Sequence, residues 1–167
     1  MQRTRLYKHK VQYYETDQMQ VVHHSNYIRW FEEARMDFLE RTRLGYPEME
    51  ERGIVCPVLE VQANYLRMVR FGDTVAVKIE IKNYNGIKLV VGYQVISKET
   101  GLVHCTGETK HCFLNNKNQP IFLKRDHPDI HEMFMKTVET VEKPKRKIKK
   151  LNIDKINYKE SEEQHED

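Results

Sequence analysis

One acid and two adjacent histidines lie where a strand-like segment gives way to a helix-like one. The segment is VQYYETDQMQVVHHSNYIRWFEEAR, residues 11–35, with Asp17 upstream of His23 and His24. The start of a helix exposes unpaired backbone N–H groups and the positive end of the helix dipole, and these hold an oxyanion. A nearby carboxylate supplies a nucleophile or a general base. The pattern predicts attack on an activated carbonyl; a thioester suits it because its thiolate leaves without a strong acid.

Each of these residues also has a structural interpretation. Asp is a common turn residue, so Asp17 can simply shape a turn. His24 can be a polar residue near a helix cap, and any catalytic role is assigned to its backbone N–H more than to its imidazole. His23 fits a supporting or surface position. Both interpretations of Asp17 stay open at the level of the residues.

A metal site is not predicted. The segment HCTGETKHC contains His104, Cys105, His111 and Cys112. Residues of equal parity share a face of a strand, and each such pair is too far apart, at about 3.3 Å per residue, to chelate one ion. No serine–histidine–acid spacing or glycine-rich phosphate loop is visible either.

The elements that position Asp17 follow from the hydrophobic pattern. Residues 5–14 favour a first strand. Residues 26–44 favour a long helix capped by Ser25 or Asn26, because one apolar stripe recurs at helical spacing. That stripe comprises Tyr27, Trp30, Phe31, Ala34 and Phe38. Gly45 and Pro47 are expected to end the helix.

Four strands and a shorter helix complete the expected fold. After a polar stretch, alternation predicts strands within residues 57–68, 74–84, 87–97 and 102–115, with a hairpin at Asn85–Gly86. A second helix is expected near residues 128–139. Tight turns make the later strands antiparallel neighbours, which gives an α+β fold with the long helix on one face. The other face and any exposed edge predict an oligomer.

Composition narrows the class of protein. The 167 residues are 39% apolar and 32% charged, which favours one globular domain, expected at residues 1–140, followed by a charged, mobile tail at 141–167. A net charge of +3 is too small by itself to argue for a nucleic-acid partner, and none is expected, although the tail's basic block leaves RNA, a membrane surface or ligand phosphates open. No apolar run predicts a membrane span or secretion signal, so we expect a cytoplasmic protein with three reduced cysteines.

The segment YYETDQMQVVHHSNYIRWFEEAR resembles the active-site segment of the hot-dog-fold acyl-CoA thioesterases, the 4-hydroxybenzoyl-CoA thioesterase-like family. The matching residues are Thr16, Asp17, Val21, Val22, His24, Tyr27, Trp30, Phe31, Glu32 and Arg35. The segment ANYLRMVRFGDTVAV resembles the strand–turn–strand that follows the helix in that family. The resemblance covers about residues 5–135 and not the tail.

The resemblance implies a five-stranded antiparallel sheet wrapped around one long helix. It implies a homodimer or a tetramer built as a dimer of dimers, with active sites at subunit interfaces and no metal or organic cofactor. Asp17 matches the catalytic carboxylate, and His24 matches the position whose backbone N–H polarises the thioester carbonyl. An acyl-CoA is the expected substrate.

Further residues are expected to contact that substrate. Val22, His23 and Tyr27 flank the catalytic positions, and the side chains of Arg67, Arg70 and Lys88 suit the coenzyme A phosphates. Gln20 stands where the family usually has glycine or alanine, so it narrows the acyl pocket or changes the turn. A hot-dog module that binds or senses an acyl-thioester without cleaving it is the alternative.

Overall fold

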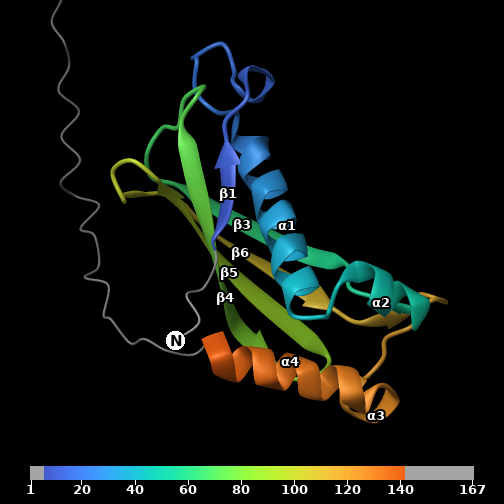
Figure 1. Ribbon diagram of the computed structural model, residues 1–167. Coiled ribbons are helices and arrows are strands. Elements are labelled where there is room, and N and C mark those ends of the chain that lie inside the picture. Colours follow the sequence, from blue (N-terminus) through green and yellow to red (C-terminus); the bar gives the residue numbers. More distant parts are fainter. Residues whose placement is uncertain (1–5, 142–167) are drawn as a thin grey trace, which may run out of the picture.

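The computed structural model describes residues 6–141 (Figure 1). Its helices are η1 (Tyr13–Glu15, a 3-10 turn), α1 (His24–Arg41), α2 (Tyr46–Glu51), α3 (Leu123–Asp126) and α4 (Pro128–Val141). Its strands are β1 (Tyr7–Lys10), β2 (Ile54–Val55), β3 (Val58–Tyr65), β4 (Thr74–Tyr84), β5 (Lys88–Ser97), β6 (Val103–Cys112) and β7 (Leu114–Asn115). The expected tail lies outside the described residues, apart from Val141.

The main sheet has five strands in the order β1-β4-β5-β6-β3, and every neighbouring pair is antiparallel. The short strands β2 and β7 pair separately. α1 lies along one face of the sheet, and α4 lies near one end of it (Figure 1). The α+β fold with a five-stranded antiparallel sheet and one long helix is therefore confirmed.

The core forms between α1 and the inward-facing positions of the strands. Trp30, Phe31 and Ala34 are completely buried on the helix. The Phe31 ring stacks on Tyr93 of β5, with centroids 4.5 Å apart. Gly107 of β6 permits this approach, because a Cβ there would lie 2.3 Å from the Phe31 ring. The sequence stripe thus places α1 in close contact with the middle of the sheet.

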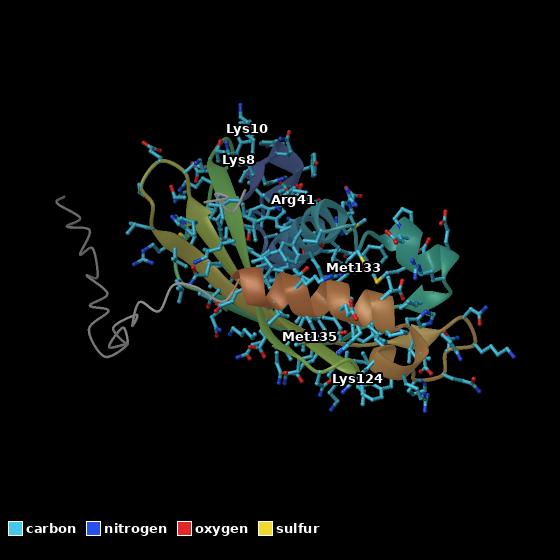
Figure 2. All side chains as sticks on the ribbon, turned by 60° about the horizontal axis from the view of Figure 1, so that its bottom comes forward. Lys8, Lys10, Arg41, Lys124, Met133 and Met135 are labelled. Carbon is cyan, nitrogen blue, oxygen red and sulfur yellow. The ribbon has the colours of Figure 1, made fainter. Side chains whose placement is uncertain are left out.

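The second amphipathic helix is also confirmed. α4 begins at Pro128, as expected, and extends two residues beyond the expected end. Its buried Ile130 and Phe134 join the same core. Figure 2 shows Met133 and Met135 on different sides of α4, in agreement with partial burial of Met133 against the core and a 40% exposed Met135.

Several element boundaries differ from the expectation. α1 runs from His24 to Arg41 rather than over 26–44, because His23, and not Ser25 or Asn26, is its N-cap. Gly45 does not end α1; it is the N-cap of α2, a helix formed by a stretch expected to be irregular. Its second position is proline, a residue tolerated in the first turn of a helix.

The ends of the sheet differ from the expectation as well. The first strand, expected over 5–14, stops at Lys10, and η1 follows it. β3 was expected to be half-buried, yet none of its side chains is fully buried: Leu59 is 58% exposed and Tyr65 47%. The reason is its position, since β3 is an edge strand that the described residues of this chain leave largely uncovered. None of the described helices is long and apolar enough to cross a membrane.

Candidate active site

Asp17 lies in a tight turn that closes immediately before α1. Its amide donates to the carbonyl oxygen of Val21 at 2.9 Å, and its own carbonyl oxygen accepts from the Gln20 amide at 2.9 Å. The Asp17 Oδ1 atom accepts from the Met19 amide at 2.8 Å. This Asx-type bond orients the carboxylate while using one of its two oxygens. The turn role foreseen for Asp17 is present, and it is compatible with a chemical role for the remaining oxygen.

The turn forces an unusual backbone conformation on Gln20. Its φ is 59°, in the left-handed region that favours glycine. The following residues return the chain to the protein body: Val22 is buried, and its amide donates to the Val69 carbonyl at 2.8 Å. Gln20 therefore acts on the site through the backbone, because it closes the loop that carries Asp17.

His23 caps the start of α1 with both its ring and its backbone. Its Nδ1 accepts from the Ser25 amide at 3.3 Å and its carbonyl oxygen accepts from the Asn26 amide at 3.0 Å. The first four amides of a helix lack intrahelical acceptors, and the amide of His24 is not among those that His23 satisfies. The predicted carbonyl-polarising group thus lies in the first turn of α1, next to the Asp17 turn.

A buried acid that sequence reasoning did not single out joins these parts. Glu15 is only 5% exposed, and its carboxylate accepts from Trp30 Nε1 at 2.8 Å and from the Gln12 amide at 2.7 Å. His9 Nε2 lies 2.8 Å from the same carboxylate. The only sequence signal was a glutamate three residues after Gln12, a spacing seen in helix capping boxes.

The hydrogen bonds to Glu15 determine its charge. Burial alone would raise the pKa of Glu15, but the bonds from Gln12, His9 and Trp30 outweigh burial and hold the pKa below its ordinary value. Glu15 is therefore an anion across the neutral range.

Aromatic side chains surround the helix start. The Tyr65 hydroxyl of β3 donates to the His24 carbonyl at 3.0 Å, and the rings of Tyr27 and Tyr65 lie 5.1 Å apart. The rings of His23 and His24 lie 4.0 Å apart. Burial raises the pKa of Tyr27 well above its ordinary value, so this phenol stays neutral. These rings offer an apolar wall beside the Asp17 turn.

The three cationic residues expected to contact the substrate lie in different parts of the fold. Arg70 pairs with Val21 across a β-bridge, which places it beside the Asp17 turn with an exposed side chain. The Arg67 guanidinium donates to the Val103 carbonyl at 2.6 Å, so it lies on the start of β6. Lys88 begins β5, at the end of the β4–β5 hairpin opposite to Arg70. A single chain brings Arg70, but not Lys88, to the site.

A hollow of about 270 Å³ lies on the sheet face turned away from α1, and none of the predicted site residues lines it. Its lining includes the ion pair between Lys82 and Glu108. Among residues 6–141, no three of His, Cys, Asp and Glu are grouped so as to hold a metal ion. The chemistry available at the Asp17 turn is that of a carboxylate and a helix N-terminus.

Comparison with known proteins shows the family of the chain. A family model described as the thioesterase-like superfamily matches residues 11–146. A Bacillus subtilis protein named "Putative acyl-CoA thioesterase YneP" is 32% identical over 127 residues, which cover 76% of this chain and 92% of that protein.

Solved structures of other proteins are also similar to this chain. A DHNA-CoA thioesterase from Staphylococcus aureus is 32% identical, has a TM-score of 0.74, and covers 79% of this chain and 89% of its own. A second S. aureus protein, solved in complex with CoA, has a TM-score of 0.75 at 18% identity, covering 86% and 88% of the two chains. The latter similarity concerns the fold alone.

Proposed function

Since the chain belongs to the thioesterase-like superfamily of hot-dog-fold proteins, we propose that it hydrolyses an acyl-CoA thioester to the free acid and coenzyme A. The observation that carries this proposal is the Asp17 turn, which hydrogen bonds between Asp17 and Val21 close just before α1, while the Glu15 carbonyl accepts from the His23 amide at the helix start. Names of the relatives supply the substrate class: an acyl-CoA in one and DHNA-CoA in another.

In the proposed reaction, the thioester carbonyl oxygen binds at the start of α1. The His24 amide and the helix dipole draw electrons from this oxygen, which stabilises the negative charge that develops on it. Asp17 either attacks the carbonyl carbon or deprotonates the water that does so. The carbon–sulfur bond then breaks and the coenzyme A thiolate leaves. If Asp17 attacked directly, water hydrolyses the resulting anhydride to the free acid and restores the carboxylate; if water attacked, the free acid forms in the same step. Arg70 is the cation best placed to meet the ligand's phosphates.

We infer that a second copy of the chain completes the site. The edge strand β3 presents Leu59 and Val61 to solvent, 58% and 39% exposed, next to Tyr65, which contacts the helix start. A sheet edge of this kind pairs readily with another chain. Lys88 can reach a bound ligand only from such a partner. Sedimentation of the full chain as a dimer or tetramer is expected; a monomer with full turnover would contradict this inference.

The test of function is thiol release from short, long and aromatic acyl-CoAs. With the best substrate, Asp17→Asn is expected to lower kcat by about 10³-fold or more, because the nucleophile or base is lost. The melting temperature is expected to change little. Asp37→Asn, a matched change at the exposed ion pair with Arg41 on α1, is expected to retain turnover.

Two results would contradict the proposal in different ways. Unchanged turnover in Asp17→Asn would remove Asp17 from the mechanism. Tight acyl-CoA binding by the wild-type chain without release of thiol would favour the binding or sensing module instead. If hydrolysis occurs, single turnover in ¹⁸O-labelled water separates the roles of Asp17, since label in its carboxylate indicates a covalent anhydride.

A further inference from the structure

Glu15 joins three elements that meet beside the proposed site. Among the described residues it is the one acid that is buried. Its carboxylate binds η1 through the Gln12 amide, α1 through Trp30 Nε1 and β1 through His9 Nε2, with separations of 2.7, 2.8 and 2.8 Å. A buried anion with three donors is held in one position, because any displacement would break a charge-assisted bond.

The backbone of the same residue binds the start of α1. The Glu15 carbonyl oxygen accepts from the His23 amide at 2.9 Å and from Asn26 Nδ2 at 2.8 Å. Asn26 is itself 8% exposed and lies in the first turn of the helix. Only Thr16 separates Glu15 from Asp17. One residue therefore fixes the chain just before the carboxylate and the helix turn that carries the His24 amide.

We propose that Glu15 is a positioning residue for the reaction: its anchored carboxylate sets the distance and angle between Asp17 and the His24 amide. This inference rests on the proposed function and names a residue outside the catalytic pair. Glu15 is not expected to touch substrate, because its carboxylate is buried and bonded to His9, Gln12 and Trp30. It acts through Asp17, whose turn it connects to α1.

Misplacement of a catalytic group affects turnover more than binding. A shift of about 1 Å in a reacting group costs on the order of 10²-fold in rate, because the near-attack geometry is lost. Ground-state contacts that the ligand makes with side chains outside the Asp17 turn do not involve Glu15. A positioning role thus lowers kcat while leaving KM nearly unchanged in chains that are fully folded at the assay temperature. A general loss of stability would lower the apparent kcat only through a smaller folded fraction, which thermal melting measures.

The chain offers a direct spectroscopic reporter of this contact. Trp30 is the only tryptophan, is completely buried, and donates its indole N–H to Glu15. Its fluorescence emission therefore reports the Glu15 environment. Glu15→Gln keeps the size of the side chain but removes the charge and replaces one acceptor oxygen with a donor.

A matched control is available on the exposed side of the same network. Glu33 on α1 accepts from the Tyr7 hydroxyl and lies 3.9 Å from His9 Nδ1, with 48% of its side chain exposed. Glu33→Gln makes the same chemical change without touching Trp30 or the Asp17 turn. Trp30→Phe removes one donor to Glu15 and retains an aromatic ring.

The experiment compares the full-length chain with these variants by kcat, KM and amide exchange of residues 16–24, and by Trp30 emission in the variants that keep Trp30. Glu15→Gln is expected to lower kcat about 10²-fold with KM within a few-fold, to shift the emission, and to speed exchange in 16–24. Trp30→Phe is expected to lower kcat less. The double variant is expected to match Glu15→Gln, because both changes act through one bond. Glu33→Gln is expected to match the wild type.

An unchanged kcat in a folded Glu15→Gln chain, or equal losses in Glu15→Gln and Glu33→Gln, would overturn the proposal. If Glu15→Gln does not fold, an unchanged kcat in Trp30→Phe overturns it. A wild-type chain that releases no thiol refutes the proposed function separately. In that case exchange in residues 16–24 decides the positioning role, and unchanged protection in Glu15→Gln would refute it.

Discussion

Near its start, α1 packs against a buried carboxylate, and near its middle it carries a buried guanidinium. Glu15, at the start, accepts three hydrogen bonds, and its pKa is held below the ordinary value. Arg35, in the middle, is 4% exposed, and its contacts are the uncharged hydroxyl groups of Tyr93, at 3.4 Å, and Tyr46. The protein thus gives the Glu15 carboxylate three hydrogen-bond donors, whereas it gives the Arg35 guanidinium only two uncharged hydroxyl groups.

The surroundings of Arg35 extend the contrast. Tyr93 shares a hydrogen bond with Thr109, whose hydroxyl lies 2.7 Å from His111 Nε2. His111 Nδ1 is buried and lacks a hydrogen-bond partner in the part of the chain that the structure describes. Burial, and secondly the charge of Arg35, lower the pKa of His111 to about 4.

The difference separates function from stability along one helix. The start of α1, where the Glu15 carboxylate accepts three hydrogen bonds, is preorganised, so substitutions there are expected to act mainly on turnover. The middle of α1 faces His111 of β6 through Tyr93 and Thr109, and protonation of this buried histidine is unfavourable, so changes there are expected to act on the free energy of unfolding. This division can be tested at either region.

The larger effect on the free energy of unfolding is expected at His111, near the middle of α1, when the pH falls. The folded-state pKa of His111 is about 4, below the ordinary 6.5. The unfolded chain therefore binds the proton first, and the stability contributed by neutral His111, complete above pH 6.5, is lost as pH falls toward 4. We expect the free energy of unfolding to drop by about 2 kcal/mol from pH 7 to pH 5.

Denaturant titration at several pH values measures this drop. His111→Gln is the control: it is expected to be less stable at pH 7 but to lose much less stability between pH 7 and pH 5, where the carboxylates stay ionised. An equal loss of unfolding free energy between pH 7 and pH 5 in the two proteins would show that His111 does not cause the sensitivity to acid.

A smaller effect of opposite sign is expected at the start of α1. The left-handed backbone conformation of Gln20, with a φ of 59°, is strained, whereas glycine adopts this conformation without strain. Gln20→Gly is expected to raise the free energy of unfolding by about 0.5 to 1 kcal/mol, measured by denaturant titration at pH 7. A loss of stability would mean that the Gln20 side chain, rather than its backbone, supports the Asp17 turn.

The sequence predicted the fold better than the two buried charges. Apolar periods indicated the long helix and the strands, because Trp30, Phe31 and Ala34 repeat at helical spacing. Arg35 follows Phe31 by four positions on that stripe, so its burial had a visible signal. Glu15 had almost none beyond its spacing from Gln12, because its bonds to His9 and Trp30 depend on how β1, η1 and α1 pack together.

The predictions for the start of α1 and for the burial of β3 were wrong for related reasons. The start of α1 depends on the His23 ring, a cap that residue preferences do not favour. Alternation in β3 predicted one buried face, but alternation does not reveal that the strand lies at the edge of the sheet. The described residues of this chain leave that face largely uncovered, so the sequence pattern alone does not specify what lies against it.

The central claim is that the start of α1 polarises a bound thioester carbonyl beside Asp17. Difference infrared spectroscopy of Asp17→Asn with a ¹³C-carbonyl acyl-CoA measures this polarisation before hydrolysis. The account predicts a carbonyl stretch at lower frequency when the substrate is bound than when it is free. A bound carbonyl with the frequency of the free ligand would contradict it.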